Sequence, residues 1–382
     1  MIAAYGATGG GADARSGGHD VHLAALDGWR GLSILLVLAA HLLPLGRHAL
    51  QINLGVGVLA MALFFNLSGF LITSYLLQDP PLTGFLIKRF CRVLPLGWLY
   101  LALALALSAA PLSTWLSHFL FYANLPPKDL VPMTEHLWSL CVEVQFYVGV
   151  ALLMLVLRAR GLVLLPLLCL MFTLWRVWHG VTASSVSYYR VDEILSGSAL
   201  ALIYRGRLGT RGRTLLARLP QWPLLLLLAA SSMPQSGWLN YLRPYLAALL
   251  IGATVMRPGT LLVRLLRWRF LVFCASISYA LYVIHPMLTF TWLGAGSLEM
   301  KYAKRPLLFA ALFALAYLST RYYESWFIAR GRDWARRWSP PPVRQVPAPA
   351  PVPVPAEELQ PTATETRPTH SYEDSLPHQS VS

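Results

Sequence analysis

Charged residues are scarce in this chain of 382 residues. Asp, Glu, Lys and Arg make up 13% of it, while 56% is hydrophobic and the mean hydropathy is +0.53. Soluble domains are close to a quarter charged, so the composition excludes an ordinary soluble fold. We predict an all-α protein, a polytopic membrane bundle of about ten transmembrane helices.

Cysteine is also rare, and its spacing excludes two further classes. The four cysteines show no paired spacing, which argues against a disulfide framework and against a CxxC metal site. The sequence also lacks GxSxG, a Walker loop, HExxH and a dinucleotide-binding GxGxxG in a strand–helix context. We expect neither a metal nor a bound cofactor.

Two other features are missing. No basic patch is interleaved with aromatic residues in a soluble segment, so the net charge of +14 gives little support to nucleic-acid binding. Residues 1–21 are polar and Gly-rich, without a short apolar core and a small-residue cleavage site. We therefore expect no cleaved signal peptide and insertion directed by the first membrane helix.

What the chain does contain is a series of apolar segments. They cover approximately residues 29–46, 54–77, 94–112, 137–157, 161–178, 192–204, 220–233, 243–257, 270–292 and 306–328.

The loops that connect these segments differ in their content of basic residues. One set of loops, together with the residues after the last segment, carries eighteen Lys and Arg, and the opposite set carries seven. The positive-inside rule then predicts that both termini are cytoplasmic. We divide the chain into a polar tail (1–22), a transmembrane domain (23–330) and a Pro-rich disordered tail (331–382).

Arg30 and His41 lie within the first apolar segment, eleven residues apart. On a helix they share nearly the same face, roughly 16 Å apart along the axis. An ionisable group inside a membrane helix is costly and therefore indicates a functional site. The alternative is a snorkelling Arg and a His that bonds to a neighbouring helix.

The fourth segment carries a polar stripe. His136, Ser139, Glu143 and Tyr147 follow i, i+3, i+7 and i+11 spacing on one helix face. Glu143 is expected at about the depth of His41, so the two can form a base and its orienting carboxylate. Two separate structural hydrogen bonds between helices are the alternative.

Basic residues cluster where the third segment leaves the cytoplasm. Arg89 and Arg92 share a face, and two guanidinium groups at this spacing suit phosphate oxygens. Ordinary anchoring to lipid headgroups is the alternative.

Further polar residues lie in three later segments. In the ninth, Ser278, Tyr282 and His285 share a face, and Pro286 should kink the helix beside the imidazole. Arg190 and Asp192 are predicted to form a structural ion pair, although a catalytic role for them stays open. Arg321 and Glu324 are predicted to form a second structural ion pair.

Six blocks of the chain resemble, in order, the sequence blocks of the acyltransferase-3 family of bacterial membrane O-acyltransferases. Residues 26–41 are similar to its Arg-X10-His pattern, 64–72 to FF-x-LSGFLI, 88–95 to RxxR followed by Pro, 136–147 to HxWSLxxExxFY, 190–197 to RxDxxxxG and 278–286 to SYxLYxxHxP. One departure is Trp29, which stands where the family more often has an aliphatic residue. The resemblance covers about residues 23–328.

The resemblance implies an acyl-CoA donor, usually acetyl-CoA, and a hydroxyl of a cell-surface or exported carbohydrate as acceptor, in some cases lipid-linked. His41 would act as general base or carry the acyl group transiently, Glu143 would orient it, and Arg30 would complete the catalytic set. Arg89 and Arg92 would hold the donor phosphates. The residues expected to line the site are His136, Ser139, Tyr147, Asp192, Tyr282 and His285.

The resemblance also implies the bacterial cytoplasmic membrane, with membrane lipids as partners. A carrier, such as a glycan exporter or a proton-coupled transporter with His and Glu as relays, is the rival class. A membrane scaffold that recruits partners through the Pro-rich tail is a third reading.

Overall fold

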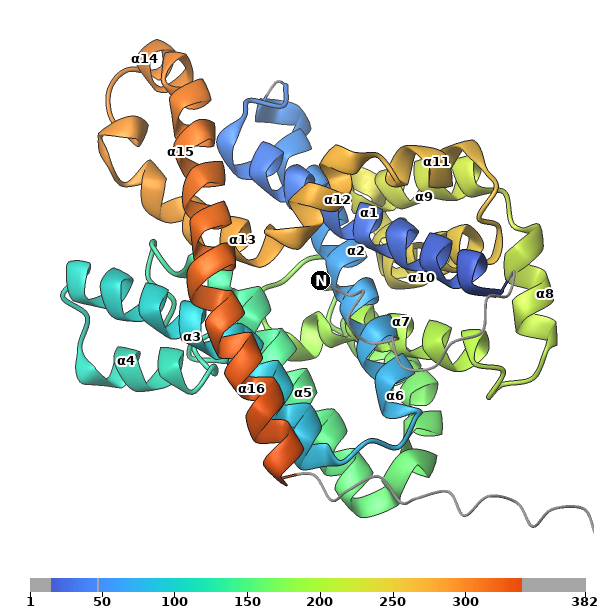
Figure 1. Ribbon diagram of the computed structural model, residues 1–382. Helices are drawn as coiled ribbons and strands as arrows, with labels where there is room; N and C mark the ends of the chain where they lie inside the picture. Colours follow the sequence, from blue (N-terminus) through green and yellow to red (C-terminus); the bar gives the residue numbers. More distant parts are fainter. Residues whose placement is uncertain (1–14, 47, 339–382) are drawn as a thin grey trace, which may run out of the picture. The chain divides into compact units, whose positions relative to one another are not determined.

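Every element in the described part of the chain is helical (Figure 1). The structure is a computed structural model that describes residues 15–46 and 48–338. Its α-helices are α1 (Arg15–Leu42), α2 (Ile52–Leu76), α3 (Leu82–Leu107), α4 (Leu112–Phe119), α5 (Trp138–Leu157), α6 (Leu165–Trp178), α7 (Val191–Tyr204), α8 (Arg211–Arg218), α9 (Gln221–Ser232), α10 (Arg243–Met256), α11 (Leu261–Leu266), α12 (Arg269–Ser276), α13 (Ser278–Thr289), α14 (Leu298–Ala303), α15 (Arg305–Leu318) and α16 (Ser325–Trp338). Short 3-10 turns are η2 (His48–Leu50), η3 (Glu135–Leu137), η4 (Arg158–Leu164), η5 (Ser187–Tyr189), η6 (Pro234–Leu242) and η7 (Trp292–Gly294), and η8 (Ser319–Glu324) is a π-helical turn.

Several of these elements are long and apolar enough to cross a membrane. Among the described residues there are five such runs, or up to seven if each of two bent helix pairs is one span. One run of 44 residues, Glu135–Trp178, contains two of the expected segments. Helices α7 and α9 are shorter than the ~20 residues of a perpendicular span, whereas α10 forms a run of 23 residues together with η6. The chain is thus a helical multi-pass protein, while ten crossings stay a prediction.

Helix α2 packs against both α1 and α7. Glycine allows the closest of these approaches, because a Cβ on Gly69 would lie 1.9 Å from the carbonyl oxygen of Ile194. A Cβ on Gly197 of α7 would lie 2.0 Å from the carbonyl oxygen of Asn66 on α2. The two backbones are therefore in direct contact, as is common between membrane helices.

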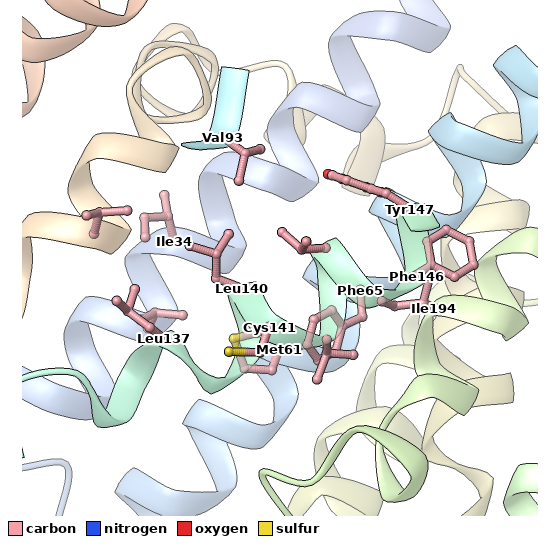
Figure 2. Packing of buried hydrophobic residues seen from close by; sticks show 14 of the residues in the cluster. Ile34, Met61, Phe65, Val93, Leu137, Leu140, Cys141, Phe146, Tyr147 and Ile194 are labelled. Atoms are coloured by element: carbon pink, nitrogen blue, oxygen red, sulfur yellow. The ribbon is translucent and has the colours of Figure 1, made fainter. Parts of the chain in front are cut away.

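Buried apolar side chains form two clusters, and both include residues of α2 and α7. The larger includes Phe65, Cys141 and Ile194, and Figure 2 shows them packed together with Met61. The smaller surrounds Trp29, which is fully buried and donates from Nε1 to Thr254 Oγ1 at 3.0 Å. The indole that departs from the family pattern therefore links α1 to α10.

Many large apolar side chains are exposed, as expected where helices face lipid. Leu155, Val156 and Leu226 are each at least 70% exposed. In water such surfaces would be costly, whereas lipid tails are as apolar as the side chains themselves. This pattern agrees with the low charge content of the sequence.

Helix α13 continues past Pro286, so the kink expected there does not end the helix. A sharp bend of 73° that we did not expect lies between α12 and α13, around Ile277. At the other end of the chain, α16 continues to Trp338, eight residues into the segment 331–382 that we expected to be disordered. Helix α1 likewise begins at Arg15, inside the expected polar tail, and the rest of both tails lies outside the described residues.

Candidate active site

A cavity with several polar side chains lies among five helices of the bundle. Its lining comes from α1 (Arg30, Ser33, Ile34, Val37), α2 (Met61, Phe64, Ser68, Leu71), α3 (Arg89, Arg92, Val93), α5 (Ser139, Leu140, Glu143, Tyr147) and α13 (Ser278, Tyr279, Tyr282). The structure thus brings together residues from five of the six sequence blocks. Such a cavity, mostly apolar with a few convergent polar groups, is the usual form of a small-molecule site.

Three guanidinium groups face this cavity. Arg30 interacts electrostatically with Arg89 and Arg92 as like charges, and with Asp27 and Glu143 as opposite charges. Arg30 lies 4.0 Å from Asp27, one turn earlier on α1. Among the described residues, neither Arg89 nor Arg92 forms an ion pair with a carboxylate. The cavity therefore carries an excess of positive charge, which suits an anionic ligand.

Glu143 is held by neighbours other than the one we expected. It accepts a hydrogen bond from Ser68 Oγ on α2 at 2.8 Å and a short one from the Tyr147 hydroxyl, one turn later on α5. No hydrogen bond joins it to His41 within the described part of the chain. The expectation that Glu143 orients His41 is therefore wrong for this structure, because equal depth in the membrane does not mean that two side chains point at each other.

The partner of His41 is His285. The Nδ1 atom of His41 lies 3.2 Å from Nε2 of His285, and the two ring planes are inclined by 24° with centroids 5.1 Å apart. His285 is 1% exposed, whereas His41 is exposed at the end of α1. Two ionisable residues singled out on α1 and α13 thus form one pair.

His136 adds a third imidazole to this pair. Its ring packs edge-on against His285 at 5.3 Å between centroids, and its Nε2 lies 3.2 Å from the carbonyl oxygen of Val283 on α13. A backbone carbonyl only accepts, so Nε2 carries the proton. We call His41, His136 and His285 the histidine cluster.

A hydrogen-bonded layer separates the cavity from the histidine cluster. The Tyr282 hydroxyl donates to the carbonyl oxygen of His136, so Ser139 Oγ, at 2.6 Å, donates to the tyrosine. Tyr282 and Ser139 line the cavity, while His41 and His285 lie about one helical turn further along α1 and α13. Of the residues that the structure describes, those lining the cavity include none of the cluster.

Asp192 lies apart from the cavity, in a buried ion network that joins α6, α7 and α10. Asp192 pairs with Arg176 at 2.5 Å. Glu193 bridges Arg190 and Arg243, with 2.9 Å to each, and all five side chains are at most 2% exposed. The expected pair of Arg190 with Asp192 is therefore wrong. We did not identify Arg176 and Arg243 from the sequence as members of a buried ion network. A signal existed for Arg176, because a charged residue inside an apolar segment indicates a buried partner or a functional site.

The pair of Arg321 with Glu324 is also absent from the described residues. Glu324 instead accepts hydrogen bonds from Ser319 at 3.3 Å and Thr320 at 2.9 Å. These residues form the π-helical turn η8, whose wider turn moves positions three apart off a common face. The α-helical spacing that we assumed therefore does not hold there.

Comparison with known proteins identifies the family of the chain. The family model described as "Acyltransferase domain" matches residues 23–321. The chain belongs to this family, acyltransferase-3.

Two curated relatives are similar at low identity. Peptidoglycan O-acetyltransferase OatA of Listeria monocytogenes (serovar 1/2a, strain EGD-e) is 25% identical over 80% of this chain and 55% of that protein. YrhL of Bacillus subtilis (strain 168), provisionally named a peptidoglycan O-acetyltransferase, is 26% identical over 70% of this chain and 48% of that protein. The chain thus spans about half the length of the curated relatives it matches. No solved structure matches it significantly.

Proposed function

We propose that this protein moves an acyl group, normally acetyl, from acyl-CoA to a hydroxyl of a cell-surface carbohydrate. The observation that carries the proposal is the excess of positive charge in the cavity, one helical turn from an exposed histidine. A coenzyme A thioester is an anion with a long, nearly uncharged arm, and this arrangement fits both parts. The names of the two relatives support a peptidoglycan acceptor or its lipid-linked precursor.

In this proposal the donor enters from the cytoplasmic end of the cavity. Arg89 and Arg92 bind its phosphate oxygens through charge-assisted hydrogen bonds. The arm then passes Arg30 and reaches the layer of Ser139 and Tyr282. Movement of this layer would open the way for the thioester to reach His41.

The transfer itself needs one lone pair on His41. In direct transfer, the acceptor hydroxyl attacks the thioester carbonyl carbon, its proton passes to His41, the carbon–sulfur bond breaks and the coenzyme A thiolate leaves. In the two-step route, His41 attacks the same carbon first, the carbon–sulfur bond breaks and the coenzyme A thiolate leaves; the acceptor hydroxyl then displaces the imidazole from the acyl group, and the released imidazole nitrogen takes the hydroxyl proton. Both routes use the same imidazole nitrogen.

We further propose that the chain lies in the bacterial cytoplasmic membrane, with ten crossings and both termini inside. The loop asymmetry of eighteen to seven basic residues supports this orientation. His41 is then near the outer leaflet, where an exported glycan is accessible. Arg89 and Arg92 are near the cytoplasm, where acyl-CoA is made.

Replacement of His41 tests the enzyme mechanism. Purified protein would receive labelled acetyl-CoA and a peptidoglycan fragment or its lipid-linked precursor. We expect His41→Ala to lower the rate of transfer by about 10²–10⁴-fold, the usual effect of removing a general base, with donor binding intact. His179→Ala, at an exposed histidine outside the cavity, is the control. Transfer by His41→Ala at the control rate would refute the mechanism.

A further inference from the structure

We propose that His285 is a positioning residue that fixes the tautomer of His41, so that the lone pair of His41 lies on Nε2. The inference rests on the proposed function, because it names which nitrogen of His41 takes the proton or the acyl group. Glu143, which the sequence suggested for this role, is bonded to Ser68 and Tyr147 instead. His285 is the side chain that lies within hydrogen-bond range of His41, whose ring also interacts with the backbone of Val37 one turn earlier on α1.

The argument begins with Pro286. Proline has no N–H, so the carbonyl oxygen of Tyr282, four residues earlier in α13, lacks its usual helical donor. The Nδ1 atom of His285 lies 2.8 Å from this oxygen. Because a carbonyl only accepts, Nδ1 of His285 carries a proton. The proline thus leaves free a backbone acceptor that binds the imidazole beside it.

The second step passes from His285 to His41. A neutral imidazole has one N–H, so a proton on Nδ1 of His285 leaves a lone pair on its Nε2. That lone pair faces Nδ1 of His41 at 3.2 Å, a distance that requires a proton between the two nitrogens. Nδ1 of His41 is therefore the donor, and the lone pair of His41 lies on Nε2.

The other two protonation states of His285 conflict with its surroundings. With the proton on Nε2, the lone pair of Nδ1 would face the Tyr282 carbonyl oxygen at 2.8 Å, and two acceptors would repel each other. With protons on both nitrogens, His285 would be a cation at 1% exposure, without a carboxylate hydrogen-bonded or ion-paired to it among the described residues. Burial of such an unpaired charge is costly.

The packing around His285 keeps this arrangement in place. His136 lies edge-on to the ring and donates from its own Nε2 to the carbonyl oxygen of Val283, so it does not compete for either nitrogen of His285. His285 is buried while His41 is exposed. The buried ring therefore aligns the accessible one, and the alignment persists when Nε2 of His41 accepts a proton, because Nδ1–H still donates to His285.

Two substitutions of His285 distinguish a role in aligning His41 from a purely space-filling role. In His285→Gln the amide oxygen reaches about as far as Nε2 and can accept from His41. In His285→Asn the shorter amide reaches only the position of Nδ1, so it keeps the contact with Tyr282 and loses His41. We expect His285→Asn to lower kcat by about 10²-fold with an unchanged KM for acetyl-CoA, because misaligned catalytic groups lose about this much. We expect His285→Gln to retain most of kcat.

Pro286→Ala provides an independent variant. It restores an N–H that competes for the Tyr282 carbonyl oxygen, while a helix interior normally becomes more stable when proline is replaced. We expect a higher unfolding temperature together with a lower kcat. A purely structural role of His285 and Pro286 predicts that stability and turnover change in the same direction.

The tautomers can also be observed without any turnover. Long-range proton–nitrogen correlations in ¹⁵N-histidine-labelled wild-type protein distinguish Nδ1–H from Nε2–H, and His41→Ala and His285→Gln assign the signals. We expect Nδ1–H for both residues. Nε2–H on either residue overturns the proposal, as does equal kcat for His285→Asn and His285→Gln. The expected tautomers in a wild-type protein that transfers no acetyl group would instead refute the proposed function.

Discussion

Gly197 on α7 and Asn66 on α2 are in backbone contact, so that a Cβ on the glycine would lie 2.0 Å from the Asn66 carbonyl oxygen. Gly69 makes the reciprocal approach to Ile194 at 1.9 Å. Both helices are also held from other sides, because α2 packs on α1 and α7 packs on α6 and α10. This contact holds α7 against α2, which contributes Ser68 to the cavity.

Gly197→Ala should therefore destabilise the protein. The added methyl group must separate α2 from α7, and overpacking of this kind costs about 1–3 kcal/mol or more. Thermal unfolding of the protein in detergent measures the effect. Gly149→Ala on α5, where a Cβ meets nothing within 4 Å, is the control and should be neutral or slightly stabilising. Equal unfolding temperatures for the two variants would contradict the prediction.

Glu193→Gln should be more damaging than its small change in shape suggests. Glu193 is the only acidic partner recorded for both Arg190 and Arg243 among the described residues, and its own side chain is fully buried. Removal of one partner from a buried ion pair costs about 3–5 kcal/mol, because the remaining charge is left unpaired. We expect a lower unfolding temperature and a lower yield of folded protein.

The matched control for this change is Glu299→Gln on α14, at an exposed position. It removes the same charge from the surface, where ion pairs contribute about 0–1 kcal/mol. If Glu193→Gln were as stable as this control, the ion network would not hold α7 and α10 together.

Much of the fold followed from the sequence, whereas the contacts between helices did not. The expected segments 54–77 and 137–157 begin and end within two residues of α2 and α5, because each is predominantly apolar and contains no proline. Helical spacing also placed His41 and His285 on the polar faces of their own helices. It could not show that these faces meet, since spacing fixes depth and direction within one helix but not its rotation against a neighbour.

Some incorrect predictions arise because spacing does not fix how a helix is rotated against its neighbour. Others arise where the backbone departs from the ideal α-helix. The bend at Ile277 lies where no glycine or proline marks it. The π-helical turn η8 changes which residues share a face with Glu324. Asp192 and Arg190 were paired by proximity in sequence, although the buried guanidinium of Arg176 on α6 competes successfully for Asp192.

Glu143→Gln should reduce transfer less than His41→Ala does. In the structure Glu143 contacts Ser68 and Tyr147, and an amide oxygen can still accept from either. We expect kcat to fall by less than the 10²–10⁴-fold of general-base removal. Turnover by the two purified variants under identical conditions checks this. An equal loss would assign Glu143 a direct part in the proton transfer.

Replacement of both Arg89 and Arg92 by Ala should weaken donor binding. Each lost charge-assisted hydrogen bond costs about 1.5–3 kcal/mol, so the KM for acetyl-CoA should rise at least about tenfold. Arg264→Ala with Arg267→Ala is a matched control, since these two exposed arginines have the same spacing and lie outside the cavity. Equal KM values for both double variants would show that Arg89 and Arg92 do not bind the donor and act as membrane anchors.

The orientation of the chain can be tested at two loops that the basic residues assign to opposite sides. Arg211 lies in a loop with five arginines, and Lys301 lies in the opposite set, which has seven basic residues in total. Because Lys and Arg are retained in the cytoplasm, a green fluorescent protein fused after Arg211 should fluoresce and one fused after Lys301 should not. Alkaline phosphatase fusions at the same two positions should give the reverse pattern. Fluorescence after Lys301 alone would invert the chain and place the Arg89 and Arg92 end of the cavity outside the cell, away from any acyl-CoA.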